Sequence, residues 1–212
     1  MPRFLGALDA LPARSVLWEI RKDRPVTGEQ LEGAAAALEN SRRRSGTPAH
    51  VLSDLALLEL LQFELAEDEL APDAQRLLTE SLEALEAGLA KAPAGSNGWA
   101  RLAYARYMRS GLTEGTRDAL EMSLLTGGID LSLLSFRLHL ILSEWEALGP
   151  EFQHAARGEI LALTRHGRRG YDALVEIYLS SGRGEVIETV LAEAPPQQAR
   201  FTRRLEARLR ID

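Results

Sequence analysis

The chain of 212 residues contains few side chains that could do covalent or metal chemistry. It has no cysteine, which excludes disulfides, thiolate nucleophiles and cysteine-ligated metals. One Glu-x-x-His pair, Glu151 and His154, has the spacing that puts two ligands on one helix face. Helical di-iron sites need two such pairs and two further glutamates. We therefore expect no metal, although a metal-binding accessory helical domain stays open as an alternative.

Phosphate-binding and nucleophile motifs are equally weak. Gly111-x-x-x-Gly115-Thr116 lacks the lysine and the preceding strand that a P-loop requires. The chain contains no Gly-x-Ser-x-Gly elbow, so an acyl-transfer site has no local signature. His139 lies in an apolar segment, which is typical of a hydrogen-bonded core histidine. The sequence therefore predicts a protein that is not an enzyme and that holds no cofactor.

Charge and hydropathy limit the partners that the chain can have. The net charge is −6, and residues 1–100 hold 16 acidic and 10 basic residues while residues 101–212 hold 15 of each. An acidic chain without a coherent basic face is a poor nucleic-acid binder. No apolar run approaches the 18 residues of a membrane span, and the first 15 residues do not resemble a signal peptide. We expect a soluble chain, cytoplasmic or, if an anchor was removed, associated with the cell envelope.

The composition and the spacing of apolar residues predict an all-α fold. Leu, Ala, Glu and Arg are strong helix formers, and no β-branched alternation is present. Helix starts are marked by a Thr27–Gln30 capping box, and by Thr47-Pro48, Ser96 or Asn97, Thr113 and Asp130 as N-caps. Proline or glycine marks most helix ends, and Pro12 is expected to break the first helical segment. These signals predict about nine to eleven short-looped helices that pack as antiparallel pairs.

Three helix starts share a bulky residue followed by Leu and a small or β-branched residue. They are Leu52-x-x-Leu55-Ala56, Trp99-x-x-Leu102-Ala103 and Tyr171-x-x-Leu174-Val175. This pattern, with Pro93 and Pro195 closing units, resembles the tetratricopeptide repeat. The resemblance implies a right-handed α-solenoid of antiparallel helix pairs. We divide the chain accordingly into an N-terminal extension (1–26), degenerate repeats (27–196) and a C-terminal capping helix (197–212).

The resemblance also implies a site. The family's concave groove corresponds here to Asn97, Ala100, Tyr104, Tyr107 and Met108, and such a groove binds a peptide or a partner helix. Alternatively, Tyr104 and Tyr107 pack against a neighbouring helix. A fainter similarity, in the N-terminal hairpin, the Trp99 unit and residues 120–128, is to repeat proteins of bacterial exopolysaccharide biosynthesis and export. The expected function is a non-enzymatic scaffold for a protein or peptide partner.

The C-terminal helix carries a basic set, Arg200, Arg203, Arg204 and Arg208. These arginines could contact an anionic partner, or they could belong to a terminal helix that covers the last repeat and complements its own dipole. A further alternative is self-association, with the basic C-terminal helix of one copy on the acidic N-terminal half of another. We expect no nucleic-acid partner and no membrane insertion.

Overall fold

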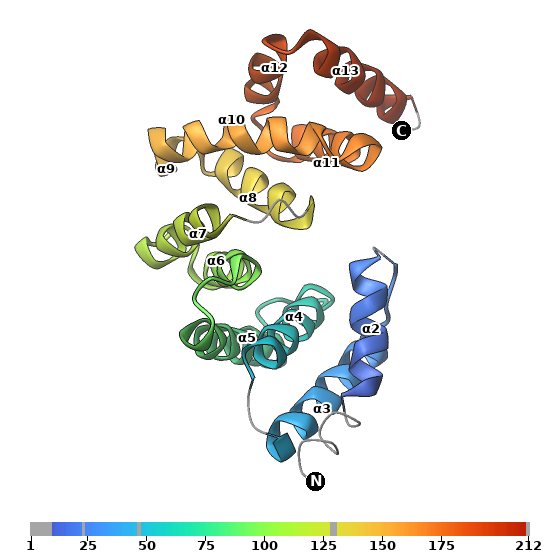
Figure 1. The fold of residues 1–212 in the computed structure, drawn as a ribbon, viewed down its shortest axis with the longest axis vertical. Helices are drawn as coiled ribbons and strands as arrows, with labels where there is room; N and C mark the ends of the chain where they lie inside the picture. Colours follow the sequence, from blue (N-terminus) through green and yellow to red (C-terminus); the bar gives the residue numbers. More distant parts are fainter. Residues whose placement is uncertain (1–9, 23, 46–47, 128–130, 211–212) are drawn as a thin grey trace. The chain divides into compact units, whose positions relative to one another are not determined.

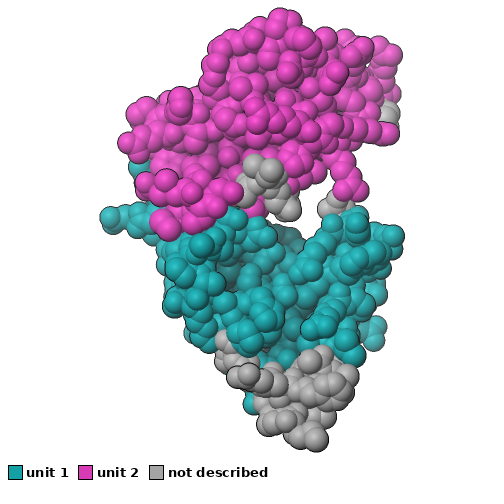
Figure 2. All heavy atoms as spheres, viewed as in Figure 1, with its two compact units in different colours: residues 1–119 teal, residues 120–212 magenta. Residues whose placement is uncertain are grey.

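The computed structural model describes residues 10–22, 24–45, 48–127 and 131–210, which form twelve helices and no strand (Figure 1). The all-α prediction is therefore confirmed for this part of the chain. Contacts divide the molecule into two compact units, residues 1–119 and 120–212, which are coloured separately in Figure 2. The boundary falls inside helix α7 (Glu114–Thr126). No described helix is both long enough and apolar enough to span a bilayer.

Unit 1 consists of helices that each pack against the next one in the chain. They are α2 (Leu11–Arg21), α3 (Gly28–Ser45), α4 (Ala49–Glu64), α5 (Pro72–Lys91) and α6 (Ser96–Ser110), followed by the start of α7. The most extensive contact is between α4 and α5. It is close at Gly88, where an added Cβ would lie 3.4 Å from the Leu52 Cβ.

Helix α4 is the centre of unit 1, because it is apolar on nearly its whole circumference. It packs between α3 and α5 and also touches α6. Its buried residues are Val51, Leu52, Leu55, Ala56, Leu58, Glu59, Leu60 and Phe63. Seven of these eight are hydrophobic, and the exception is a glutamate. A central helix therefore places one acidic group inside the packed part of the unit.

Unit 2 is organised around α8 (Leu131–Ser143), which packs against α10 (Pro150–Thr164) and α11 (Gly167–Ser180). The short α9 (Trp145–Leu148) joins α8 to α10, and α12 (Gly184–Ala192) and α13 (Pro195–Leu209) complete the unit. Helix α8 also buries one charged residue, Arg137, which is 2% exposed. Unlike Glu59, Arg137 is fully paired: Nε and Nη2 each donate to Glu159 at 3.0 Å, and Nη1 donates to the Ser123 carbonyl at 3.1 Å.

Several predicted helix boundaries are confirmed. The Thr27 N–H donates to Gln30 Oε1 at 2.9 Å and the Gln30 N–H donates to Thr27 Oγ1 at 3.3 Å, which is a complete capping box. The Thr116 N–H donates to Thr113 Oγ1 at 3.2 Å, as expected of an N-cap threonine. Gly111, with φ of 68°, follows the last residue of α6. These signals work because both partners lie within one helical turn.

Other boundaries differ from the predictions. Helix α2 begins at Leu11, so Pro12 lies in its first turn, where its missing N–H removes no intrahelical bond. The residues before Ala10, where the expected break would show, lie outside the described residues. Helix α6 is preceded by Gly95 with no side-chain cap, so Ser96 and Asn97 are already helical. The apolar segment after Asp130, which the sequence predicts as one helix ended by Gly149-Pro150, is interrupted at Glu144. Thr47 and Asp130 lie outside the described residues.

The junction before α6 is held by Trp99. Its indole Nε1 donates to the Pro93 carbonyl at 2.7 Å, and its side chain is only half-buried. The core positions of this helix are instead Leu102 and Ala103, which are 2% and 0% exposed. Trp99 therefore fixes the turn between α5 and α6, and it does not fill the core.

Candidate functional site

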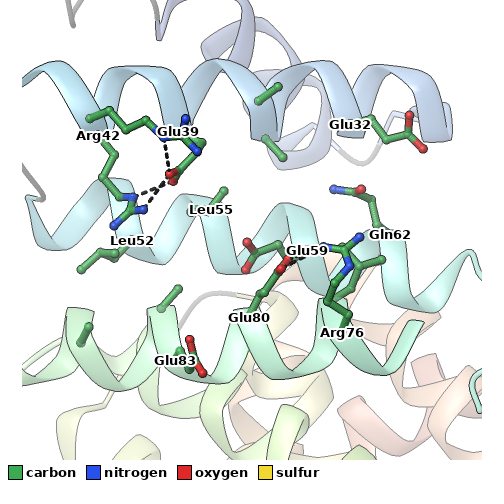
Figure 3. A pocket seen from close by; sticks show the side chains of 16 residues that line it. Glu32, Glu39, Arg42, Leu52, Leu55, Glu59, Gln62, Arg76, Glu80 and Glu83 are labelled. Carbon is green, nitrogen blue, oxygen red and sulfur yellow. Dashed lines mark hydrogen bonds and ion pairs between the residues drawn. The ribbon is translucent and has the colours of Figure 1, made fainter. Parts of the chain in front are cut away.

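Unit 1 contains an open groove between α3 and α5, with α4 as its floor (Figure 3). We call it the α3–α5 groove, and its volume is about 620 Å³. The floor residues are Leu52, Leu55, Glu59 and Gln62, which occupy one stripe of α4. Small residues of the flanking helices widen the groove: Ala35, Ala36, Ala84 and Ala87.

Glu59 is the unusual residue of this floor. It is 7% exposed, and its Oε2 has no hydrogen-bond partner within the described structure. Buried carboxyl oxygens are nearly always hydrogen-bonded, because leaving one unpaired costs about 1–3 kcal/mol. The neighbouring apolar floor residues offer it no donor. A donor supplied from outside the chain would satisfy it.

The arginine side chains on the walls of the groove are already paired with glutamates of the same helix. On α3, Glu39 accepts from Arg42 at 2.6 Å and from Arg43 at 3.0 Å. On α5, Arg76 donates to Glu80 at 2.8 and 2.9 Å. These pairs bind the arginines next to Glu59 to other carboxylates, and Figure 3 shows the Glu59 carboxyl lying beside the Arg76–Glu80 pair.

The groove as a whole is acidic. Five glutamates line it, against three arginines; the glutamates are Glu32, Glu39, Glu59, Glu80 and Glu83. The pKa of Glu59 is raised from 4.5 to about 8. Burial is the largest cause, and the negative charges of Glu80 and Glu39, which also raise the pKa, outweigh the positive charges of Arg76 and Arg42, which lower it. At neutral pH the Glu59 carboxyl is therefore held in its neutral form, and a cation placed next to it would favour the ionised form.

The lining of the groove offers carboxyl groups, guanidinium groups, one amide and apolar side chains. The side chains that line the groove include no serine, cysteine, histidine or lysine that could act as a nucleophile or proton shuttle. Within the described residues, no group of three or more His, Asp or Glu side chains could hold a metal ion. In α10, Glu151 and His154 are both exposed. The chemistry available in the groove is hydrogen bonding and ion pairing on an apolar floor.

The residues proposed from the repeat resemblance lie on α6, away from this groove's lining. Asn97 is exposed, whereas Tyr104, Tyr107 and Met108 are half-buried. Ala100 is 1% exposed, so it is a core residue and cannot contact a partner. Tyr104 hydrogen-bonds Glu64 of α4, and its pKa is raised mainly by burial and then by the Glu64 charge.

The C-terminal arginines separate into two kinds. Arg204 donates to Asp172 at 2.6 Å and Arg208 donates to Glu176 at 3.1 Å, so both hold α13 on α11. Arg200 and Arg203 are exposed and have no ion pair or hydrogen bond from their side chains to any described residue. The capping interpretation of this helix therefore fits the first pair, and a binding interpretation fits the second.

Sequence reasoning missed Glu59, although a signal was present. Glu59 stands in the run Leu57-Leu-Glu-Leu-Leu61, and it lies four residues after Leu55 on the same helical stripe. A charged residue on a core-facing stripe predicts either a buried pair or a site. The two cases differ only in whether another helix brings a partner, and that is not visible in the local sequence.

Comparison with known proteins does not assign the chain to a family. No protein-family model matches the chain, and no curated protein matches its sequence.

Proposed function

We propose that this protein is a non-enzymatic helical scaffold that binds a segment of a partner protein in the α3–α5 groove. The observation that carries the proposal is Glu59 Oε2, which is buried on the floor of an open groove and has no hydrogen-bond partner among the described residues. The partner segment would place apolar side chains on Leu52 and Leu55. It would also bring a lysine or arginine to Glu59.

The charge of the groove favours a cationic segment. Its arginines are bound to Glu39 and Glu80, so they do not compete for Glu59. An incoming ammonium or guanidinium group would form a charge-assisted hydrogen bond in a partly desolvated site, where such bonds are strongest. A neutral or acidic segment would leave Glu59 unsatisfied and would also meet the net negative charge of the walls.

A tetratricopeptide-like solenoid is the architecture that we propose for this scaffold. Supporting it, successive helices of unit 1 pack in chain order. Helices α4 and α6, which carry the first two copies of the repeat pattern, are also linked directly. Arg101 of α6 donates to the Ser53 carbonyl at 3.0 Å and to Ser53 Oγ at 2.9 Å. In such arrays, binding surfaces form where consecutive helices line a concave face.

The proposal is tested by selecting peptides from a random display library on the full chain at pH 8.5. We expect the enriched peptides to share a lysine or arginine flanked by apolar residues. Their affinity should fall at least tenfold, about 1.4 kcal/mol, on Glu59→Gln. It should not change on Glu29→Gln, which removes the same charge from an exposed position of α3 outside the groove.

Two outcomes would contradict this assignment. If the selected peptides share no cationic residue, Glu59 is not the binding residue. The same follows if the peptides bind the wild type and Glu59→Gln with equal affinity. Loss of binding on combined Tyr104→Ala and Tyr107→Ala changes, with Glu59→Gln neutral, would instead place the peptide on α6. Light scattering of the free protein at two salt concentrations would reveal a second copy of the chain as the occupant of the groove.

A further inference from the structure

A second hollow lies in unit 2, between the first turn of α11 and the middle of α13. Its volume is about 410 Å³, and four of the six residues that line it are arginines. The lining is Gly167, Arg168, Tyr171, Arg200, Arg203 and Arg204. We call it the arginine hollow, and it shares no residue with the α3–α5 groove.

The positions of these arginines follow from how α13 is anchored. Phe201 is 3% exposed and its ring meets Tyr178 of α11 edge-on, with 5.6 Å between centroids. With Phe201 turned inward, Arg200, Arg203 and Arg204 share one flank of α13, since residues three and four apart are neighbours on a helix. Tyr171, which is 4% exposed, lies buried at the hollow on the α11 side.

Positive charge in the arginine hollow is poorly compensated. Asp172 is the acidic group that pairs with its lining: Arg204 donates to it at 2.6 Å, and Arg168 lies 3.7 Å from it. Among the described residues, Asp172 thus pairs with two of the four lining arginines, Arg168 and Arg204. Arg200 and Arg203 have no side-chain partner among the described residues, although they are next to each other on the same flank.

We propose that the arginine hollow binds a phosphate-type oxyanion, either a phosphate ester or a pyrophosphate group. Guanidinium groups match the oxygens of phosphate with paired, planar N–H donors, and a phosphate group carries about two negative charges near neutral pH. Such a ligand offsets the repulsion between Arg168, Arg200 and Arg203. Helix α11 begins at Gly167, so the partial positive charge of its N-terminus adds to the field of the arginines.

The test uses inorganic pyrophosphate and the full-length protein at constant ionic strength. Binding is measured by titration calorimetry, and the arginine Nε–Hε signals are followed by NMR. We expect saturable binding that shifts the Nε–Hε signals of Arg168, Arg200 and Arg203. The double change Arg200→Gln and Arg203→Gln should weaken binding at least tenfold. Because both side chains are exposed and without partners, this variant should fold normally, and circular dichroism checks that.

A matched variant separates a site from diffuse charge. Arg14→Gln with Arg165→Gln removes the same two charges from exposed positions outside the hollow, and it should bind pyrophosphate as the wild type does. Equal weakening of both double variants would overturn the proposal, as would the absence of shifts at the hollow arginines.

A vesicle experiment identifies the source of the phosphate. Vesicles of phosphatidylcholine with phosphatidic acid are added in place of pyrophosphate. Binding that pyrophosphate displaces, and that requires Arg200 and Arg203, supports the site and indicates a lipid headgroup. Pyrophosphate binding without vesicle binding supports the site with a soluble ligand. Vesicle binding that neither pyrophosphate nor the double change reduces counts against the hollow.

Discussion

Replacing Glu59 by glutamine should change how the stability of unit 1 depends on pH. Glutamine keeps the size of the side chain but cannot ionise. In the wild type, the native state holds a proton on Glu59 up to a pKa of about 8, whereas the unfolded chain loses it near pH 4.5. The native state therefore binds more protons than the unfolded state between these values, and its stability must fall as pH rises through this window.

The magnitude follows from the same two pKa values. One proton of difference is equivalent to about 1.4 kcal/mol per pH unit. Between pH 5.5 and pH 7.5 the wild type should therefore lose about 2–3 kcal/mol of unfolding free energy relative to Glu59→Gln. With a urea m-value of about 2 kcal/mol per molar, the difference between their unfolding midpoints should change by about 1 M.

Tryptophan fluorescence can follow unit 1 in the full chain. Trp18 and Trp99 belong to unit 1 and Trp145 to unit 2, so a Trp145→Phe background restricts the signal to unit 1. Urea unfolding is then measured from pH 5 to pH 9 with and without Glu59→Gln. Groups such as Asp54, whose pKa is also raised by burial, titrate in both proteins and cancel in the difference.

Glu83→Gln is the matched control, because Glu83 lines the same groove but is exposed to solvent. Its stability profile should run parallel to that of the wild type. If the profile of Glu59→Gln is also parallel to the wild type from pH 5.5 to pH 7.5, Glu59 is not held neutral in the groove, and the reasoning about its burial is wrong. A carbon NMR titration of the glutamate carboxyl groups would confirm the cause.

Two further predictions concern unit 2, followed through Trp145 fluorescence with Trp18 and Trp99 replaced by phenylalanine. Arg137→Met should destabilise the unit by about 3–5 kcal/mol, because it leaves Glu159 buried without its partner. Adding Glu159→Gln should recover part of this loss. No recovery would show that lost packing, and not the unpaired charge, causes the destabilisation. Gly170→Ala should also destabilise unit 2 strongly, because the added Cβ would lie 1.9 Å from the Leu163 carbonyl oxygen. Gly158→Ala, which adds a Cβ in open space within α10, should instead stabilise the unit by up to about 1 kcal/mol. Similar unfolding midpoints for the two alanine variants would contradict the close approach of α10 and α11.

Several helix boundaries in the described residues follow from residue type and spacing alone. Thr27 and Gln30 cap α3, Thr113 caps α7, and Gly111 ends α6, as predicted. All these interactions join groups within a single helical turn, so residue type and spacing are enough to predict them. At Ser96 and Asn97, by contrast, the predicted N-cap is wrong, because both residues are already helical.

Which charged residues are paired depends on helices that pack together from distant parts of the sequence. Glu59 and Arg137 look alike in sequence, each a charged residue within an apolar run, but α10 brings Glu159 to Arg137, whereas among the described residues no helix brings a donor to Glu59 Oε2. In the same way, α11 takes up Arg204 and Arg208 and leaves Arg200 and Arg203 without partners. Pairing depends on residues tens of positions away, and desolvation depends on every helix packed around the group, so neither follows from spacing along one helix.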